Sequence, residues 1–213
     1  MKTRMRSIRL RRAAGVLIVF FAAAPRARAD GESGPWQFTL FAGGWNAISN
    51  PYVLKTASSS SVVSYGNSHC FGANFGRDVT PQIGIEVGWT RSFPALQLVG
   101  SPPVPIQQVT MDTFELDGLW YFSRGRLRPF ATLGVGIVNT GSSFGGTNLT
   151  IAAGAGVKAF LSRLFAVRAD VRFHDTSSGS TGGSAAFCDS NGCYYPRGWY
   201  WSVNVTAGLT VAF

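Results

Sequence analysis

The sequence has few charged residues and few side chains that bind metals. Only 14% of its 213 residues are charged, and it has two histidines and three cysteines. After Ala24 it lacks an apolar run of the ~20 residues that a transmembrane helix requires. Its glycine pairs lie in extended segments without a following helix, so no dinucleotide or phosphate-loop site is indicated. We therefore expect no helical membrane anchor in the fold, no cofactor and no metal.

The first 29 residues are predicted to be a cleaved secretory signal peptide. A basic stretch without acids comes first, with the cations Lys2, Arg4, Arg6, Arg9, Arg11 and Arg12. The apolar run Ala13 to Ala24 follows, shorter than the ~20 residues that span a bilayer. Ala27-Arg28-Ala29 then has the small-x-small pattern of a cleavage site. The mature chain, residues 30–213, fits one domain.

Removal of this segment changes the charge balance. The full chain has a formal charge of +9, from 19 basic and 10 acidic residues, and eight of the basic residues precede residue 30. The mature chain keeps 11 basic residues against 10 acidic ones, a net charge of about +1. The basic patch that nucleic-acid binding needs is therefore absent, and we expect no nucleic-acid partner.

Apolar and small or polar residues alternate along the last segment of the chain. From Trp199 to Phe213 every second residue is apolar, which indicates a β-strand with one apolar face. Two Trp at one end of that face are typical of a membrane-interface girdle. Similar alternation predicts seven earlier strands, near residues 36–44, 69–77, 83–90, 113–122, 131–137, 151–159 and 165–174.

The connections between these strands alternate between long and short. Long ones cover about residues 47–67, 93–109, 141–147 and 175–198, and short ones lie near 78–82, 123–127 and 161–164. In an outer-membrane barrel, long loops face outside and tight turns face the periplasm. The sequence thus predicts an all-β fold, an eight-stranded antiparallel up-and-down transmembrane β-barrel, closed so that no strand edge is exposed.

The end of the chain and two glycine-rich segments carry a family resemblance. Residues Thr206 to Phe213 read polar, x, Gly, x, x, apolar, x, aromatic, and the other segments are 128–136 and 154–158. The mature chain resembles the OmpA/OmpX-type outer-membrane β-barrels over essentially its whole length, without the peptidoglycan-binding domain of larger relatives. The resemblance implies surroundings of outer-membrane lipids and lipopolysaccharide. It also implies that the barrel-assembly machinery reads Thr206, Gly208, Val211 and Phe213.

Because side chains alternate between the two faces of a strand, the residues between the outward apolar ones face the lumen of the predicted barrel, and several of them are charged. These residues are Glu86, Glu115, Asp117, Lys158, Arg168, Asp170 and Arg172. Apart from Asp170, the acids belong to the third and fourth strands, roughly across the barrel from the bases. Eight strands enclose a lumen just wide enough for side chains, and buried charges need partners. We therefore expect a salt-bridge network that closes the lumen; the alternatives are a gated ion path and a catalytic site.

His174 and the cysteines are the remaining candidates for chemistry. Some small outer-membrane barrels are lipid A deacylases with a His and a Ser two residues later, but position 176 is Thr here. We therefore expect His174 to be a solvated residue at a loop junction, with no catalytic residue in the chain. Cys188 and Cys193 bracket a turn-forming tetrapeptide, which predicts a disulfide in an oxidising envelope. Cys70 is left as a free thiol on the lumen face.

Three functions remain open from the sequence. The first is a structural or surface-interaction role through the long loops, which are expected to carry any extracellular ligand site. Their segments 58–61, 102–105 and 177–183 are expected to be flexible or turn-rich. The second is a narrow porin-like channel for small solutes. The third is a lipid A-modifying hydrolase, which the Thr at position 176 weakens.

Overall fold

The computed structural model describes residues 36–56, 60–99, 102–141, 146–178, 187–189, 192–196 and 198–213. The predicted signal peptide, residues 1–29, lies outside these ranges. In the part of the chain that is described, no helix is long and apolar enough to cross a membrane.

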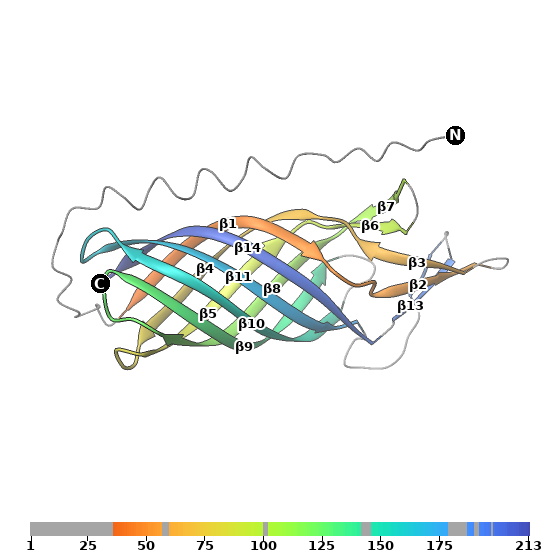
Figure 1. Cartoon of the computed structure of the whole chain (residues 1–213). Helices are drawn as coiled ribbons and strands as arrows, with labels where there is room; N and C mark the ends of the chain where they lie inside the picture. The colour runs from red at the N-terminus through yellow and green to blue at the C-terminus, as the bar shows by residue number, and fades with distance from the viewer. Residues whose placement is uncertain are drawn as a thin grey trace, which may run out of the picture.

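Eight long strands close into an antiparallel barrel (Figure 1). They are β1 (Gln37–Ala47), β4 (Ser68–Asp78), β5 (Ile83–Ser92), β8 (Thr110–Tyr121), β9 (Leu127–Gly141), β10 (Gly146–Phe160), β11 (Phe165–Ser177) and β14 (Trp199–Ala212). Each strand pairs with the barrel strands before and after it in this order, and the pairing of β1 with β14 closes the ring. The predicted up-and-down barrel is confirmed, and several of its strands are longer than predicted.

The two ends of the barrel differ in their connections. The short connections 79–82, 122–126 and 161–164 lie at one end, together with the start of β1 and the end of β14. We call this the turn end; it carries the C-terminus in Figure 1. The other four connections leave the opposite end, which we call the loop end, and three of them are long. The connection between β9 and β10 has only four residues, 142–145, because both strands extend further than predicted. The predicted alternation of long and short connections therefore holds at six of the seven positions, and the prediction of a long connection near 141–147 is wrong.

Three long connections form a second sheet, which we call the loop sheet. Its strand order is β12 (Phe187–Asp189), β13 (Gly192–Pro196), β2 (Tyr52–Lys55), β3 (Ser60–Tyr65), β6 (Ala95–Leu98) and β7 (Val104–Gln108). It extends beyond the loop end in Figure 1. The prediction of flexible or turn-rich segments is wrong for residues 60–61, which lie in β3, and for residues 104–105, which lie in β7. Residues 58–59 and 179–183 lie outside the described residues. The strands of the loop sheet pair across connections that are distant in sequence, and periodicity within one connection does not reveal such pairing.

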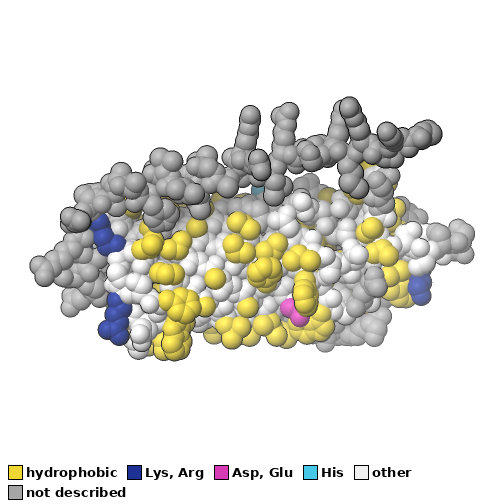
Figure 2. Space-filling view, viewed as in Figure 1, with side chains coloured by type: hydrophobic (Ala, Val, Ile, Leu, Met, Phe, Trp, Pro, Cys, Tyr) yellow, Lys and Arg dark blue, Asp and Glu magenta, His cyan; other side chains and the backbone are white. Residues whose placement is uncertain are grey.

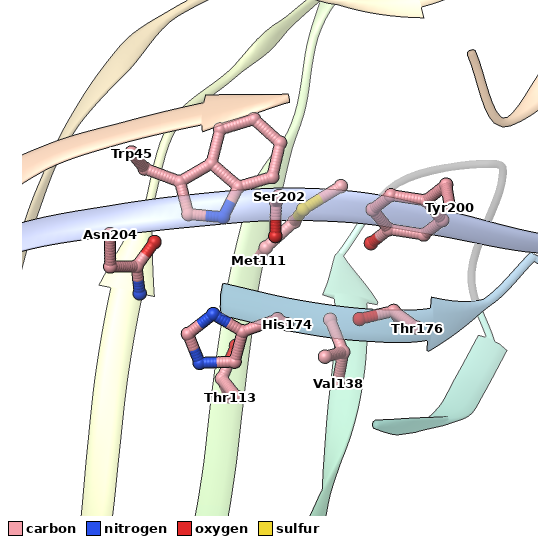
Figure 3. A pocket seen from close by; sticks show the side chains of 9 residues that line it. All are labelled: Trp45, Met111, Thr113, Val138, His174, Thr176, Tyr200, Ser202 and Asn204. Atoms are coloured by element: carbon pink, nitrogen blue, oxygen red, sulfur yellow. The ribbon is translucent and has the colours of Figure 1, made fainter. Parts of the chain in front are cut away.

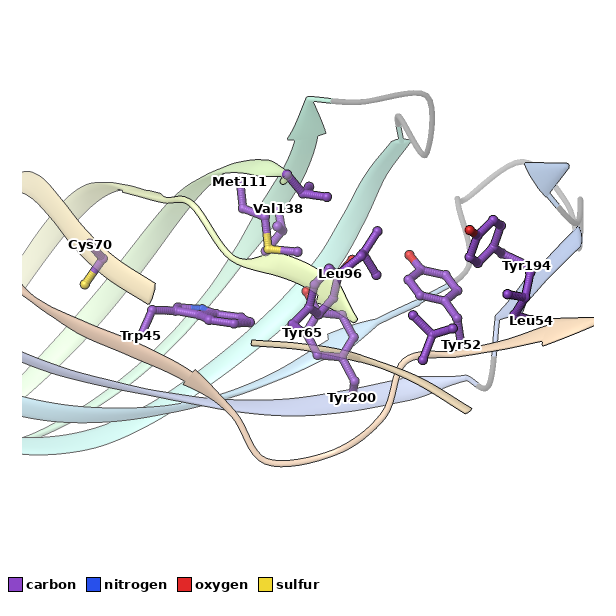
Figure 4. Packing of buried hydrophobic residues seen from close by; sticks show 12 residues of the cluster. Trp45, Tyr52, Leu54, Tyr65, Cys70, Leu96, Met111, Val138, Tyr194 and Tyr200 are labelled. Atoms are coloured by element: carbon purple, nitrogen blue, oxygen red, sulfur yellow. The ribbon is translucent and has the colours of Figure 1, made fainter. Parts of the chain in front are cut away.

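A hydrophobic cluster joins the loop sheet to the loop end of the barrel (Figure 4). Its members are Trp45, Tyr52, Leu54, Val63, Tyr65, Cys70, Leu96, Val109, Met111, Val138, Tyr194 and Tyr200. The ring of Tyr65 lies 5.9 Å from that of Trp45 and 5.6 Å from that of Tyr200, between centroids, and 6.2 Å from that of Tyr52. Tyr65 of the loop sheet therefore packs against both barrel strands at the closure, β1 and β14.

The outer wall of the barrel is apolar. Its outward positions carry large hydrophobic side chains that are strongly exposed, for example Leu133 at 66% and Leu209 at 64%. Figure 2 shows hydrophobic side chains along the wall, with Lys and Arg side chains at the two ends. Soluble monomers rarely expose so extended an apolar surface, whereas a barrel that faces lipid requires one.

Candidate functional site in the charged lumen

The seven charged residues predicted for the lumen all point into it. They are between 1 and 7% exposed. They come from β5, β8, β10 and β11. Because β5 and β11 are four strands apart in either direction around the ring, a contact between them crosses the barrel's diameter. The alternation of side chains along each strand places these charges inside and the apolar residues outside.

Glu86 of β5 is bound by two cations from the far wall. Arg168 Nη1 donates to its two carboxylate oxygens at 2.8 and 2.7 Å, and Lys158 Nζ donates to Oε1 at 2.8 Å. Lys158 also donates to Gln37 Oε1 at 3.0 Å and to the Tyr121 hydroxyl at 2.9 Å. The ammonium group of Lys158 thus has three partners, which matches its three hydrogens.

Arg172 of β11 connects a second group of acids to the same network. Its Nη1 donates to Asp117 Oδ2 at 2.5 Å and to Glu115 Oε2 at 3.4 Å. Its Nε lies 3.5 Å from Asp170 Oδ1, and Arg168 Nε donates to Asp170 Oδ2 at 2.5 Å. The two arginines therefore share Asp170, and the charges form one continuous network across the lumen.

His174 extends this network toward the loop end. Its Nε2 lies 2.9 Å from Glu115 Oε1, and the residue is 5% exposed. The expectation of a solvated residue at a loop junction is wrong, because β11 continues to Ser177 and keeps His174 inside the barrel. The hydroxyl of Thr176 is 2.9 Å from that of Thr150. The imidazole and the Thr176 hydroxyl therefore have separate partners.

A further ion pair closes the turn end of the lumen. Arg128 Nη1 donates to Asp78 Oδ2 at 3.2 Å, and both side chains are buried. The sequence analysis missed this pair because it placed Asp78 in a turn. The alternation of side chains along the strand could have placed Arg128 in the lumen. Arg128 lies two residues before Phe130 and four before Thr132, and both of these face inward. An inward arginine at a strand end requires a partner when it is buried.

Glycines on the lumen face make room for the charged side chains. A Cβ built on Gly134 would overlap the carboxylate of Asp117, and one on Gly156 would lie 2.5 Å from the Cβ of Asp170. Larger residues at these positions would therefore displace the acids that hold the arginines. The glycine-rich strand segments are thus part of the construction of the site.

Two small cavities lie between the network and the loop end. Each has a volume of about 10 Å³, space for about one water molecule. Asn204 lines both cavities. His174 lines the one nearer the loop end (Figure 3), and Arg172 lines the one nearer the charged network. Each of these residues has a buried polar atom without a hydrogen-bond partner among the described residues, namely Asn204 Oδ1, His174 Nδ1 and Arg172 Nη2. The cavities therefore suit single ordered waters.

The cysteines are placed as the sequence predicts. Cys188 and Cys193 form a disulfide that joins paired residues of β12 and β13. Cys70 is free and buried. Among the described residues, no group of three or more His, Cys, Asp or Glu side chains is arranged to hold a metal ion.

The residues of the predicted assembly signal lie along the closing strand β14. Thr206 points inward and donates to Asp170 Oδ1 at 2.9 Å. A Cβ on Gly208 would overlap a backbone oxygen of β1. Val211 and Phe213 are exposed on the outer wall, Phe213 at 59%. The position of each of these residues in the folded barrel is thus consistent with its residue type. Recognition of the segment by the assembly machinery stays a prediction.

The barrel is similar in fold to solved outer-membrane proteins. OprG from Pseudomonas aeruginosa matches with a TM-score of 0.55 and 12% identity, over 85% of this chain and 97% of that chain. The outer membrane protein AlkL, solved in lipid bilayers, matches with a TM-score of 0.52 and 17% identity, over 89% and 94%. No family model matches the chain, and no curated protein matches it either. The chain has the fold of the outer-membrane β-barrels.

Alkaline pH is expected to open the loop sheet. Burial raises the pKa of the Tyr65 phenol well above its ordinary value, with a further contribution from nearby phenols, and burial also raises the pKa of Tyr52. Tyrosine phenols of the unfolded chain ionise at a pH of ~10. At that pH the phenols of Tyr65 and Tyr52 therefore stay neutral in the folded sheet. The loop sheet loses stability as the pH rises above that value. We expect near-ultraviolet circular dichroism to fall together with a cooperative rise of phenolate absorbance. Non-cooperative titration of every tyrosine near pH 10, with the dichroism unchanged, would contradict this.

Proposed function

We propose that the protein is a non-enzymatic structural barrel of the cell outer membrane, with a lumen closed by ion pairs and an interaction surface on the loop sheet. The turn end faces the periplasm and the loop end faces outward, as long and short connections do in such barrels. One observation carries the closed lumen: the Arg168 guanidinium binds Glu86 across the full diameter of the barrel.

The balance of the network also supports closure. Four cations meet five carboxylates in the lumen, and His174 contacts one of the acids. Ion pairs in a water-poor interior hold their geometry because separation leaves uncompensated charges. A mobile ion that enters would have to displace these contacts. The two cavities of about 10 Å³ are each the size of one water and do not favour a continuous wet path.

The interaction role rests on the loop sheet. Its strands are paired, it contains a disulfide, and its aromatic core is packed against the barrel. Binding residues are often presented by surface segments that a rigid scaffold positions. On its surface, Lys55 Nζ lies 4.8 Å from the centre of the exposed Tyr195 ring. A partner outside the cell would meet a preformed surface. The separate partners of His174 and Thr176 do not favour the hydrolase.

Single-channel conductance of the mature protein in a planar bilayer tests the closed lumen. We expect the wild type to be silent and the double variant Arg168→Ala/Arg172→Ala to conduct, because two side chains that fill the lumen are removed. Arg163→Ala, at an exposed residue of the turn 161–164, is the control and should stay silent. Heat-modifiable migration on gels verifies that each variant is folded. Steady conductance by the wild type would overturn the closed lumen in favour of the narrow porin-like channel.

A further inference from the structure

An apolar groove opens on the outer wall toward the turn end. Its volume is about 310 Å³, and it is lined by three consecutive residues from each of three neighbouring strands, 83–85 of β5, 118–120 of β8 and 131–133 of β9. Gly118 faces outward at its centre and pairs with Ile85 on one side and Leu133 on the other. These two side chains are 46 and 66% exposed and form the walls. The missing side chain of Gly118 creates the depression between them.

Gly118 differs from the glycines of the lumen, because nothing in the barrel requires a glycine there. A Cβ built on Gly118 has only the carbonyl oxygen of Leu133 within 4 Å, at 3.8 Å. By contrast, a Cβ on Gly134 would overlap the carboxylate of Asp117. A side chain at position 118 is therefore compatible with the fold and would fill the groove. The structural consequence of glycine at this position is the groove itself.

An aromatic residue at the edge of the groove and a basic residue beyond it complete the site. Trp120 lies one outward position closer to the turn end and is 57% exposed. Arg124 lies in the connection 122–126, which joins the two groove strands β8 and β9, and it is exposed. Arg124 follows Trp120 by four residues, in the hairpin turn beyond the end of β8. An apolar groove thus leads toward a cation at the rim of the wall.

The charge at the turn end is unbalanced. Arg77, Arg124 and Arg163 are exposed there. The described turn-end connections and adjoining strand ends contain one acid, Asp78, which is buried against Arg128. Exposed arginines at a membrane surface attract anionic headgroups. The groove offers apolar contact in the same region, and Arg124 belongs to the hairpin that forms it.

We propose that the groove and Arg124 form a binding site for one anionic phospholipid of the periplasmic leaflet. An acyl chain lies in the groove over Gly118, between Ile85 and Leu133, and the phosphate contacts Arg124. Trp120 lies between the two parts, at the level where aromatic side chains meet headgroups. The site rests on the proposed orientation, with the turn end toward the periplasm, and is independent of whether the lumen conducts.

Native mass spectrometry of the mature protein in detergent tests this site, with phosphatidylglycerol and phosphatidylcholine as added lipids. We expect the wild type to retain one phosphatidylglycerol in preference to phosphatidylcholine. Arg124→Ala should lower the phosphatidylglycerol occupancy about fivefold, the factor that one arginine near a lipid surface contributes. Gly118→Leu should lower the occupancy of both lipids, because its side chain fills the groove.

Two matched variants serve as controls. Arg163→Ala removes an exposed arginine from a different turn, and Ala207→Leu adds the same side chain as Gly118→Leu to the outer wall on β14, across the barrel from β8. Both should bind lipid as the wild type does. Unchanged binding by Gly118→Leu would overturn the groove, and equal losses from Arg124→Ala and Arg163→Ala would overturn the single site in favour of general attraction to the rim. Conductance by the wild type would refute the closed lumen and leave these results unaffected.

Discussion

Replacement of Glu86 by alanine is expected to destabilise the barrel by about 3–5 kcal/mol, the usual cost of leaving buried cations without their acid. Glu86 accepts hydrogen bonds from Arg168 and from Lys158, and all three side chains are at most 5% exposed. Alanine leaves two positive charges close together in the lumen without the carboxylate between them. Glu86→Gln keeps the volume and one acceptor oxygen, so its loss should be smaller.

Urea-induced unfolding of the protein in lipid vesicles measures this effect. Asp112→Ala provides a matched control, because Asp112 also binds an arginine on the barrel, Arg91, through two hydrogen bonds of 2.7 and 2.8 Å. The Arg91 side chain is 40% exposed, so solvent replaces the lost partner and the expected cost is about 0–1 kcal/mol. Equal losses from Glu86→Ala and Asp112→Ala would mean that the lumen pairs are solvated, and would contradict a network that excludes water.

The barrel and the composition of its lumen follow from a short-range property of the sequence. Side chains of a strand alternate between two faces, so every inward residue is two positions from the next. In a closed ring with lipid outside, the apolar face must point outward. These two rules place Glu86 and Arg168 inside without knowledge of any contact. The order of the strands then places β5 opposite β11.

The individual pairings do not follow from those rules. Which acid meets Arg172 depends on the stagger of neighbouring strands, a property of the closed barrel. His174 was misplaced for a related reason: parity put it on the lumen face, but β11 ends at Ser177, three residues later than predicted. Strand ends carry weak periodic signals because only a few residues remain to alternate. Asp78 was assigned to a turn for the same reason.

The loop sheet was beyond prediction because its strands are short and its partners are remote. β2 and β13 pair Val53 with Tyr195 across most of the length of the chain. β2 follows β1 in the chain, and β13 precedes β14. The pairing of β1 with β14 at the closure of the barrel therefore brings β2 and β13 together. A four-residue strand such as β6 has too few residues for a periodic pattern. The loop sheet is thus a consequence of barrel closure.

Replacement of Tyr65 by alanine is expected to detach the loop sheet from the barrel. Tyr65 is 3% exposed, and its ring contacts those of Trp45 and Tyr200 on the barrel and that of Tyr52 in the loop sheet. Truncation of a large buried aromatic side chain typically costs about 3–5 kcal/mol. The short strands of the loop sheet depend on packing against the barrel for their stability. The cost therefore falls on the loop sheet, because the lumen network does not involve Tyr65.

Limited proteolysis and urea unfolding, measured on the same variant, separate the two units. Tyr65→Ala should be cleaved much faster than the wild type in the connections 47–67 and 93–109, with an unchanged urea midpoint for the barrel. Tyr65→Phe keeps the ring contacts and loses only the hydroxyl that hydrogen-bonds to Tyr52, so its cleavage should stay close to that of the wild type. A lower urea midpoint for Tyr65→Ala would show that the loop sheet and the barrel unfold as one cooperative unit. A partner bound to the loop sheet would then stabilise the whole barrel, whereas independent unfolding restricts that stabilisation to the sheet.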